Sequence, residues 1–229
     1  MAVAVENDPF SLDIRAGVLE DAKRFGMKAV IDEKLPRDLA DMSAILTKVK
    51  LLKPDVLLVS GHSKGAATAV RQIDEQNVKV SMIGITHCEA ADVTGKFGAA
   101  ANDILCPTQW AETLTYEDPI FGTAENFNSE VKAKYDAYAN RPIPYQLAQA
   151  SAAIYVFKDA FERAGSLDKE TVRDAIAATD LKTFYGNVKF SEAGNNVAKP
   201  MVLRQIQDGK YNVVAPSDFA SHQVNWPRG

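Results

Sequence analysis

The sequence predicts an α/β protein whose first half forms a doubly wound parallel sheet. Two observations lead to this prediction. Short apolar runs alternate with amphipathic stretches over residues 1–106, a pattern typical of parallel strands connected by crossover helices. After residue 106 the pattern changes to helices with only weak strand signals between them. We therefore expect one complete doubly wound lobe together with an incomplete second lobe.

The expected strands of the first half are short apolar runs bounded by turn residues. They are Val3–Val5, Lys28–Ile31, Val56–Ser60, Val80–Ile85 and Asp103–Cys106. The helices between them carry apolar residues three or four positions apart. The first opens at Asp8-Pro9 and stops at Gly26, and the others are Leu39–Leu52, Ala66–Gln76 and Ala91–Phe97. A β-α unit thus occurs four times and a strand closes the series, which completes a doubly wound lobe.

The second half reads as three helices followed by a hairpin. The helices are Phe121–Asn140, Gln146–Ala164 and Lys169–Ala178, and the hairpin strands are Lys199–Gln207 and Lys210–Val214. Residues 216–229 look irregular. The helix over 146–164 has one apolar side that needs a sheet to cover, whereas the sheet of the first half has its own helices. Something for these helices to pack against is missing.

Composition and charge restrict the class of protein. The chain has 229 residues, with 46% hydrophobic and 24% charged side chains, which is typical of a globular protein of one or two domains. A net charge of −4 without a basic cluster argues against nucleic acid and anionic membranes as partners. No apolar run approaches the roughly 20 residues that span a bilayer, and the first residues have no signal-peptide pattern.

The two cysteines, Cys88 and Cys106, could pair or remain free. Each follows an apolar run, where a buried small thiol is the ordinary finding, so we expect two inert thiols. His87 beside Cys88 suggests zinc or a thiol nucleophile at first sight. No further His or Cys stands at ligand spacing, so we expect no metal and no other cofactor.

Ligands bind open parallel sheets at the carboxyl ends of the strands, so the segments after the strands are the candidate site. These segments are 6–11, 60–65 and 86–90. The first offers Asp8, Phe10 and Ser11 at a helix start, where backbone N–H groups can receive an anion. Asp8 and Ser11 can equally be plain helix caps.

The second segment, Gly61-His62-Ser63-Lys64-Gly65, matches the G-x-S-x-G pattern of α/β-hydrolases. In that interpretation Ser63 is the nucleophile and His222 the base, with Asp180 or Asp208 as the acid. Only two strands precede the loop, no oxyanion segment is visible, and His222 lies in the irregular tail. A serine hydrolase is therefore the alternative function. In the other interpretation, Gly61 and Gly65 allow a tight turn and Lys64 lies in solvent.

Four segments in order, 3–15, 51–61, 180–190 and 205–211, resemble the Leu/Ile/Val-binding type of ABC-transporter substrate-binding proteins. The resemblance implies a type I periplasmic binding fold, in which two doubly wound lobes close on a small polar solute. Residues 1–106 would be the C-terminal-type lobe, rejoined by strands near 198–215. Residues 107–197 would be the remaining part of the N-terminal-type lobe, and 216–229 a tail. The chain thus looks N-terminally truncated relative to that family.

The resemblance also implies ligand positions. Phe10 and His62 fall where the family places aromatic contacts, and Tyr145 is a contact from the other lobe. Thr86 to Cys88 fall where amino-acid binders place an acid for the ligand ammonium, and the nearest acid, Glu89, is displaced. An amide or an aromatic carboxylate is therefore as good a candidate as a branched-chain or other amino acid. The expected ligand-binding residues are Phe10, Ser11, His62, Thr86, His87, Cys88 and Tyr145.

The leading expectation is a solute-binding component of an ABC importer without catalytic activity. The resemblance implies a periplasmic location and membrane permease subunits as partners. A homo-oligomer could cover the incomplete lobe. A cytosolic ligand-sensing domain of the same fold is a third interpretation, and it would need a DNA-binding or signalling segment that the sequence does not show.

Overall fold

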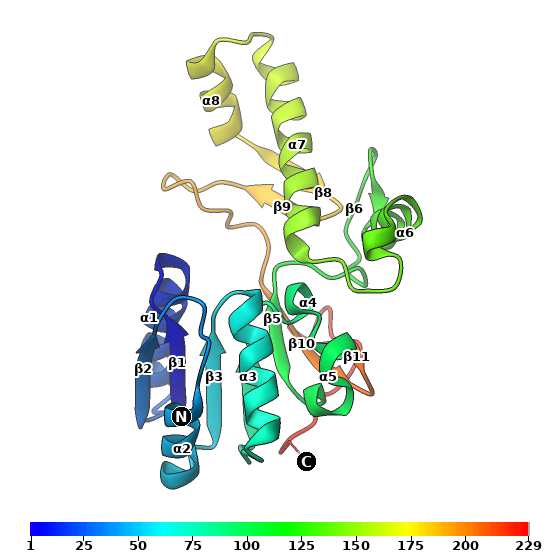
Figure 1. The fold of residues 1–229 in the computed structure, drawn as a ribbon. Coiled ribbons are helices and arrows are strands. Elements are labelled where there is room, and N and C mark those ends of the chain that lie inside the picture. Colours follow the sequence, from blue (N-terminus) through cyan, green and yellow to red (C-terminus); the bar gives the residue numbers. More distant parts are fainter. Residues whose placement is uncertain (229) are drawn as a thin grey trace. The chain divides into compact units, whose positions relative to one another are not determined.

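The computed structural model describes residues 1–228, and the chain divides into two compact units (Figure 1). Unit 1 contains Met1–Thr108, Leu203–Ala215 and the segment from Ala220 onward. Unit 2 contains Gln109–Val202 and Pro216–Phe219. Unit 1 is therefore assembled from stretches that lie far apart in the sequence.

Unit 1 is built on a seven-stranded sheet in the order β11-β10-β5-β4-β3-β1-β2. The strands are β1 (Ala2–Glu6), β2 (Ile31–Leu35), β3 (Val56–Ser60), β4 (Met82–Ile85), β5 (Leu105–Thr108), β10 (Val202–Gln207) and β11 (Lys210–Ala215). β1 to β5 pair in parallel, and β10 and β11 form an antiparallel hairpin. The predicted α/β class with a mostly parallel sheet is confirmed.

Alternation along β1 explains why helices cover both faces of this sheet. Val3 and Val5 belong to the cluster under α1 (Pro9–Arg24), whereas Ala2 and Ala4 belong to the larger core on the other face. That core lies under the remaining helices of the unit. They are α2 (Ser43–Leu52), α3 (Ser63–Glu75), α4 (Cys88–Ala91), α5 (Val93–Phe97) and the 3₁₀ helix η1 (Gly98–Ala101).

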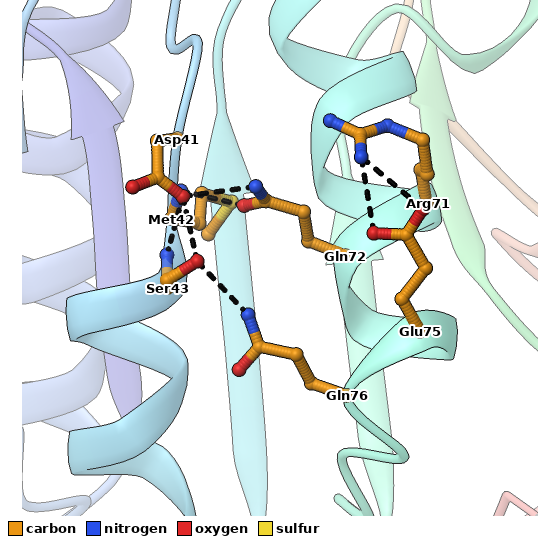
Figure 2. A network of polar contacts seen from close by, with 7 residues as sticks. All are labelled: Asp41, Met42, Ser43, Arg71, Gln72, Glu75 and Gln76. Atoms are coloured by element: carbon orange, nitrogen blue, oxygen red, sulfur yellow. Dashed lines mark hydrogen bonds and ion pairs between the residues drawn. The ribbon is translucent and has the colours of Figure 1, made fainter.

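A polar network joins the start of α2 to α3 (Figure 2). The side-chain amide of Gln72 accepts a 2.6 Å bond from the Met42 backbone N–H and donates a 2.9 Å bond to Asp41. Asp41 also accepts from the hydroxyl and backbone N–H of Ser43, and these bonds lower the pKa of Asp41 to about 2. The network satisfies N–H groups at the start of α2 without a side-chain cap from Met42 itself.

Unit 2 is mainly helical and has only two-stranded sheets. Its elements are β6 (Glu117–Asp118), β7 (Gly122–Thr123), α6 (Ala124–Lys134), η2 (Asp136–Tyr138), α7 (Tyr145–Ala164), α8 (Lys169–Ala177), β8 (Asp180–Thr183) and β9 (Gly186–Lys189). Its core is an aromatic cluster in which Phe184 stacks on Phe127 at 4.2 Å between ring centroids, with Trp110 edge-on to both. Ile154, Phe157 and Phe161 of α7 stay exposed.

Three sequence expectations are corrected. The second strand runs over 31–35 rather than 28–31, because it is an edge strand with alternating polar residues and no apolar run. The helix expected over 121–140 spans only Ala124–Lys134, since Tyr135 adopts an extended backbone. The expectation of two free thiols is wrong: Cys88 and Cys106 form a disulfide, because α4 and β5 bring their Cα atoms to 6.0 Å.

None of the helices within residues 1–228 is long and apolar enough to cross a membrane.

Candidate functional site

Three neighbouring strands of unit 1 deliver three aromatic rings to one place. Phe10 follows β1, His62 follows β3 and His87 follows β4. Their ring centroids lie 5.7 Å apart for Phe10 and His62, 5.2 Å for Phe10 and His87, and 5.4 Å for His62 and His87. Parallel strands end at the same edge of a sheet, so loops distant in sequence converge there. We call Phe10, His62 and His87 the aromatic cluster.

Hydrogen bonds between the side chains of Thr86 and His87 and the backbone of Gly61 hold two of these loops together. The Thr86 hydroxyl donates to the Gly61 carbonyl at 2.8 Å and accepts from the Gly61 N–H at 3.1 Å. His87 Nδ1 lies 2.9 Å from the same carbonyl, which can only accept, so Nδ1 carries the proton. Burial lowers the pKa of His87, so the ring is neutral at pH 7 and its Nε2 is an acceptor.

Asp8 caps helix α1 and contacts the aromatic cluster. Its Oδ1 accepts a 3.2 Å bond from the Ser11 N–H and lies 3.6 Å from His62 Nε2. Burial alone would raise the pKa of Asp8, but the hydrogen bonds from residues 10 and 11 and the His62 charge hold it below its usual value. Asp8 is therefore an ionised carboxylate although only 6% of it is exposed.

Sequence reasoning missed Glu6, the last residue of β1. Its side chain is 2% exposed, and its Oε1 lies against the loop after β3. A Cβ at Gly61 would lie 2.7 Å from Oε1, and one at Gly65 would overlap the same atom. The two glycines of the G-x-S-x-G pattern thus make room for a carboxylate. The sequence did offer a signal for Glu6. It is a charged residue at the end of an otherwise apolar strand, and a Gly-x-x-x-Gly loop follows another strand of the same sheet.

A cavity of about 440 Å³ opens beside these residues. It is lined by Glu6, Asp8, Pro9, Phe10, Arg37, Asp38, His62 and Lys64. Three acids, two basic residues and the Phe10 and His62 rings of the cluster therefore border one solvent-accessible cavity. Glu6, Asp8 and His62 also form a group whose ligand atoms all lie within 4.8 Å of one another.

The other predicted residues are placed differently. Ser11 is fully buried. Thr86 is also buried, and its hydroxyl is engaged in the hydrogen bonds with Gly61. Cys88 is fully buried in the disulfide, which removes the thiol that a ligand would contact. Tyr145 is the first residue of α7 and belongs to unit 2.

The alternative with Ser63 as nucleophile has no support. Ser63 begins α3 after β3, whereas the N–H of His222 donates to Val213 of β11 at 3.2 Å. The strands β4, β5 and β10 lie between β3 and β11 in the sheet. Four strand spacings of about 4.8 Å separate the two positions by about 19 Å, far beyond a hydrogen bond.

Comparison with known proteins gives a family match over most of the chain. The family model described as "Periplasmic binding protein" matches residues 1–210. The Leu/Ile/Val-binding protein homolog 7 of Brucella abortus is 24% identical over 237 aligned positions, which cover 100% of this chain and 58% of the relative. The chain therefore spans a little over half the length of the curated relatives that it matches.

Solved structures share the fold. The leucine binding protein LivK of Thermotoga maritima superposes with a TM-score of 0.79 at 21% identity, over 93% of this chain and 59% of that one. A solute binding protein of R. palustris in complex with benzoate has a TM-score of 0.74 at 20% identity, over 93% and 57% of the two chains.

Proposed function

This chain belongs to the periplasmic binding protein family, and from that premise we propose that it binds a small solute for an ABC importer. The family and the fold are those of transport substrate-binding proteins, which are not enzymes. We propose that the protein that contains this chain works in the periplasm and delivers its solute to membrane permease subunits.

The observation that carries the proposal is the aromatic cluster beside the cavity of about 440 Å³. A few polar groups around an apolar surface are the ordinary design of a small-molecule site. Phe10 is 38% exposed, so its ring has a face available to a planar or branched apolar group. Neutral His87 and the Thr86 loop fix the position of the cluster.

The solute class follows from the polar groups at this place. The relatives' names include Leu/Ile/Val binding, and a neighbour holds benzoate. We propose a branched-chain amino acid, an amide or an aromatic carboxylate, with its apolar part on Phe10 and His62. Thr86 and His87 remain proposed contacts.

The experiment is a calorimetric titration of the chain with leucine, isoleucine, valine, benzoate and benzamide. We expect at least one to bind, and Phe10→Ala to weaken that binding about 5- to 30-fold, because a stacked ring contributes roughly 1–2 kcal/mol. Phe25→Ala is the matched control, since Phe25 ends the same helix and is 66% exposed. Equal loss in both variants, or no binding by any compound, contradicts the proposal.

A further inference from the structure

Two buried carboxylates beside the cavity each have an oxygen without a hydrogen-bond partner. These atoms are Oε1 of Glu6 and Oδ2 of Asp8, and the residues are only 2% and 6% exposed. Taking an ionised carboxylate out of water costs several kcal/mol unless a cation or hydrogen bonds compensate it. A positively charged group beside these two oxygens would remove that cost.

The protein compensates these acids only in part, because Asp8 accepts a hydrogen bond at Oδ1 whereas its Oδ2 and Glu6 Oε1 have no partner. Arg37 and Lys64 line the same cavity, but Lys64 pairs with Asp38 at 3.5 Å. Within residues 1–228, the only ion pair that either buried acid makes within 4.0 Å is that of Asp8 with His62. Arg37 lines the cavity without an ion pair to either acid, so among the described residues His62 is the one such partner of the two carboxylates.

His62 completes a set of three donors. One ligand atom from each of Glu6, Asp8 and His62 lies within 4.8 Å of the other two. Asp8 Oδ1 and His62 Nε2 are 3.6 Å apart. Two donors on a tetrahedral metal with bonds of about 2.1 Å are about 3.4 Å apart, so this pair is already at ligand spacing. The side chain of His62 is 57% exposed and can adjust its position beside the two acids.

We propose that Glu6, Asp8 and His62 bind a divalent transition-metal ion of the zinc class at the edge of the cavity. Mixed carboxylate and imidazole donors are the usual ligands of such ions. Three protein ligands leave a coordination position for water or for an oxygen of a bound molecule. Metal binding needs no solute, because all three donors come from the chain, although His62 also belongs to the surface proposed for the solute.

The test is a titration of the chelator-treated chain with Zn²⁺ alone by calorimetry, and with Co²⁺ by visible absorption. We expect one equivalent of metal and a Co²⁺ spectrum of low coordination number with nitrogen and oxygen donors. Glu6→Gln and Asp8→Asn should each weaken binding at least tenfold. Both changes keep the shape of the side chain, and Asn remains a good helix cap, so the variants should fold.

Matched controls separate this site from other surface donors. His62→Gln should weaken binding as the acid variants do, whereas His222→Gln and Asp13→Asn should not, because His222 and Asp13 are exposed elsewhere in unit 1. Binding that is equal in wild type and Asp8→Asn overturns the proposal. The proposal is also overturned if methylammonium raises the thermal stability in a Glu6-dependent way and no metal ion does so. That result would assign the acids to an organic cation.

Discussion

Arg204 and Glu89 form an ion pair in the interior of unit 1. Arg204 Nη2 lies 2.9 Å from Glu89 Oε2, and the two side chains are only 3% and 1% exposed. The guanidinium also lies over the Tyr211 ring, 4.7 Å from its centroid, and the Thr108 hydroxyl donates to Glu89 Oε1 at 3.2 Å. The pair joins β10 to α4, the helix that follows His87.

Removing one partner of this pair should be strongly destabilising. Arg204→Met leaves the Glu89 carboxylate buried without its cation, which typically costs about 3–5 kcal/mol of unfolding free energy. Urea denaturation measures the loss. Arg71→Met is the control, because the exposed pair of Arg71 with Glu75 contributes about 0.5 kcal/mol or less. Similar losses in the two variants would contradict this account of the buried pair.

Gly65→Ala should destabilise unit 1 by about 1–3 kcal/mol, the usual cost of overpacking. Its new Cβ would overlap Glu6 Oε1 and lie 3.1 Å from the Cβ of Leu39. Gly17→Ala, in exposed α1 with nothing within 4 Å, should instead stabilise by about 0.5–1 kcal/mol. In a Glu6→Ala background the cost of Gly65→Ala should fall, and a double-mutant cycle measures that coupling. Unchanged cost in that background would rule out the Glu6 contact as the cause.

Reduction of the disulfide should lower stability by about 3 kcal/mol, since the bond closes a loop between residues 18 apart in sequence. Thermal unfolding with and without a reductant tests this. The double variant Cys88→Ala/Cys106→Ala should unfold near the reduced wild type and should not respond to reductant. An unfolding temperature of the wild type that is the same with and without reductant would refute the expectation.

Lys199 should make the stability of unit 2 rise with pH. Burial lowers the pKa of Lys199 to about 8, with Nζ bonded to the Gln109 carbonyl and 4.3 Å from the Tyr185 ring centroid. The unfolded pKa is about 10.4, so between pH 8 and 10.4 the unfolded chain binds more protons and stability increases. Below pH 8 the cost of the buried charge is fully present.

The measurement is the difference in unfolding free energy between wild type and Lys199→Met at pH 7, 8.5 and 10. That difference should shift in favour of wild type by on the order of 1–2 kcal/mol, allowing for partial solvent screening. Lys169→Met, at an exposed position at the start of α8, should show no comparable shift. If the difference between wild type and Lys199→Met did not change with pH, Lys199 would be charged in the folded state throughout this range.

The buried strands were predictable because their residues are almost all apolar. Val56–Ser60 is predicted and observed with the same bounds, and α7 differs from the prediction by one residue. The hairpin of β8 and β9 was missed because its strands, Asp180–Thr183 and Gly186–Lys189, are short and half polar. Its stability comes from contacts that one sequence does not reveal, such as Phe184 in the aromatic core.

The site was partly predictable by the rule that loops after parallel strands converge. That rule, with the family resemblance, selected Phe10, His62 and His87, and these three rings meet in the structure. It could not select Glu6, because in the sequence this residue is simply the polar end of a strand. Only the structure shows that Gly61 and Gly65 lie against its carboxylate. The disulfide was missed because pairing depends on the distance between α4 and β5.

The discontinuous course of unit 1 has a consequence for the order in which the protein is made. β5 ends at Thr108, and its neighbour β10 begins only at Val202. During synthesis the growing chain therefore carries an open strand edge at β5 while about a hundred further residues emerge, and open edges pair with other chains. A backbone bond from the Ile206 N–H to the Ile104 carbonyl helps to close that edge, so the edge stays exposed to pairing with other chains until β10 has been made.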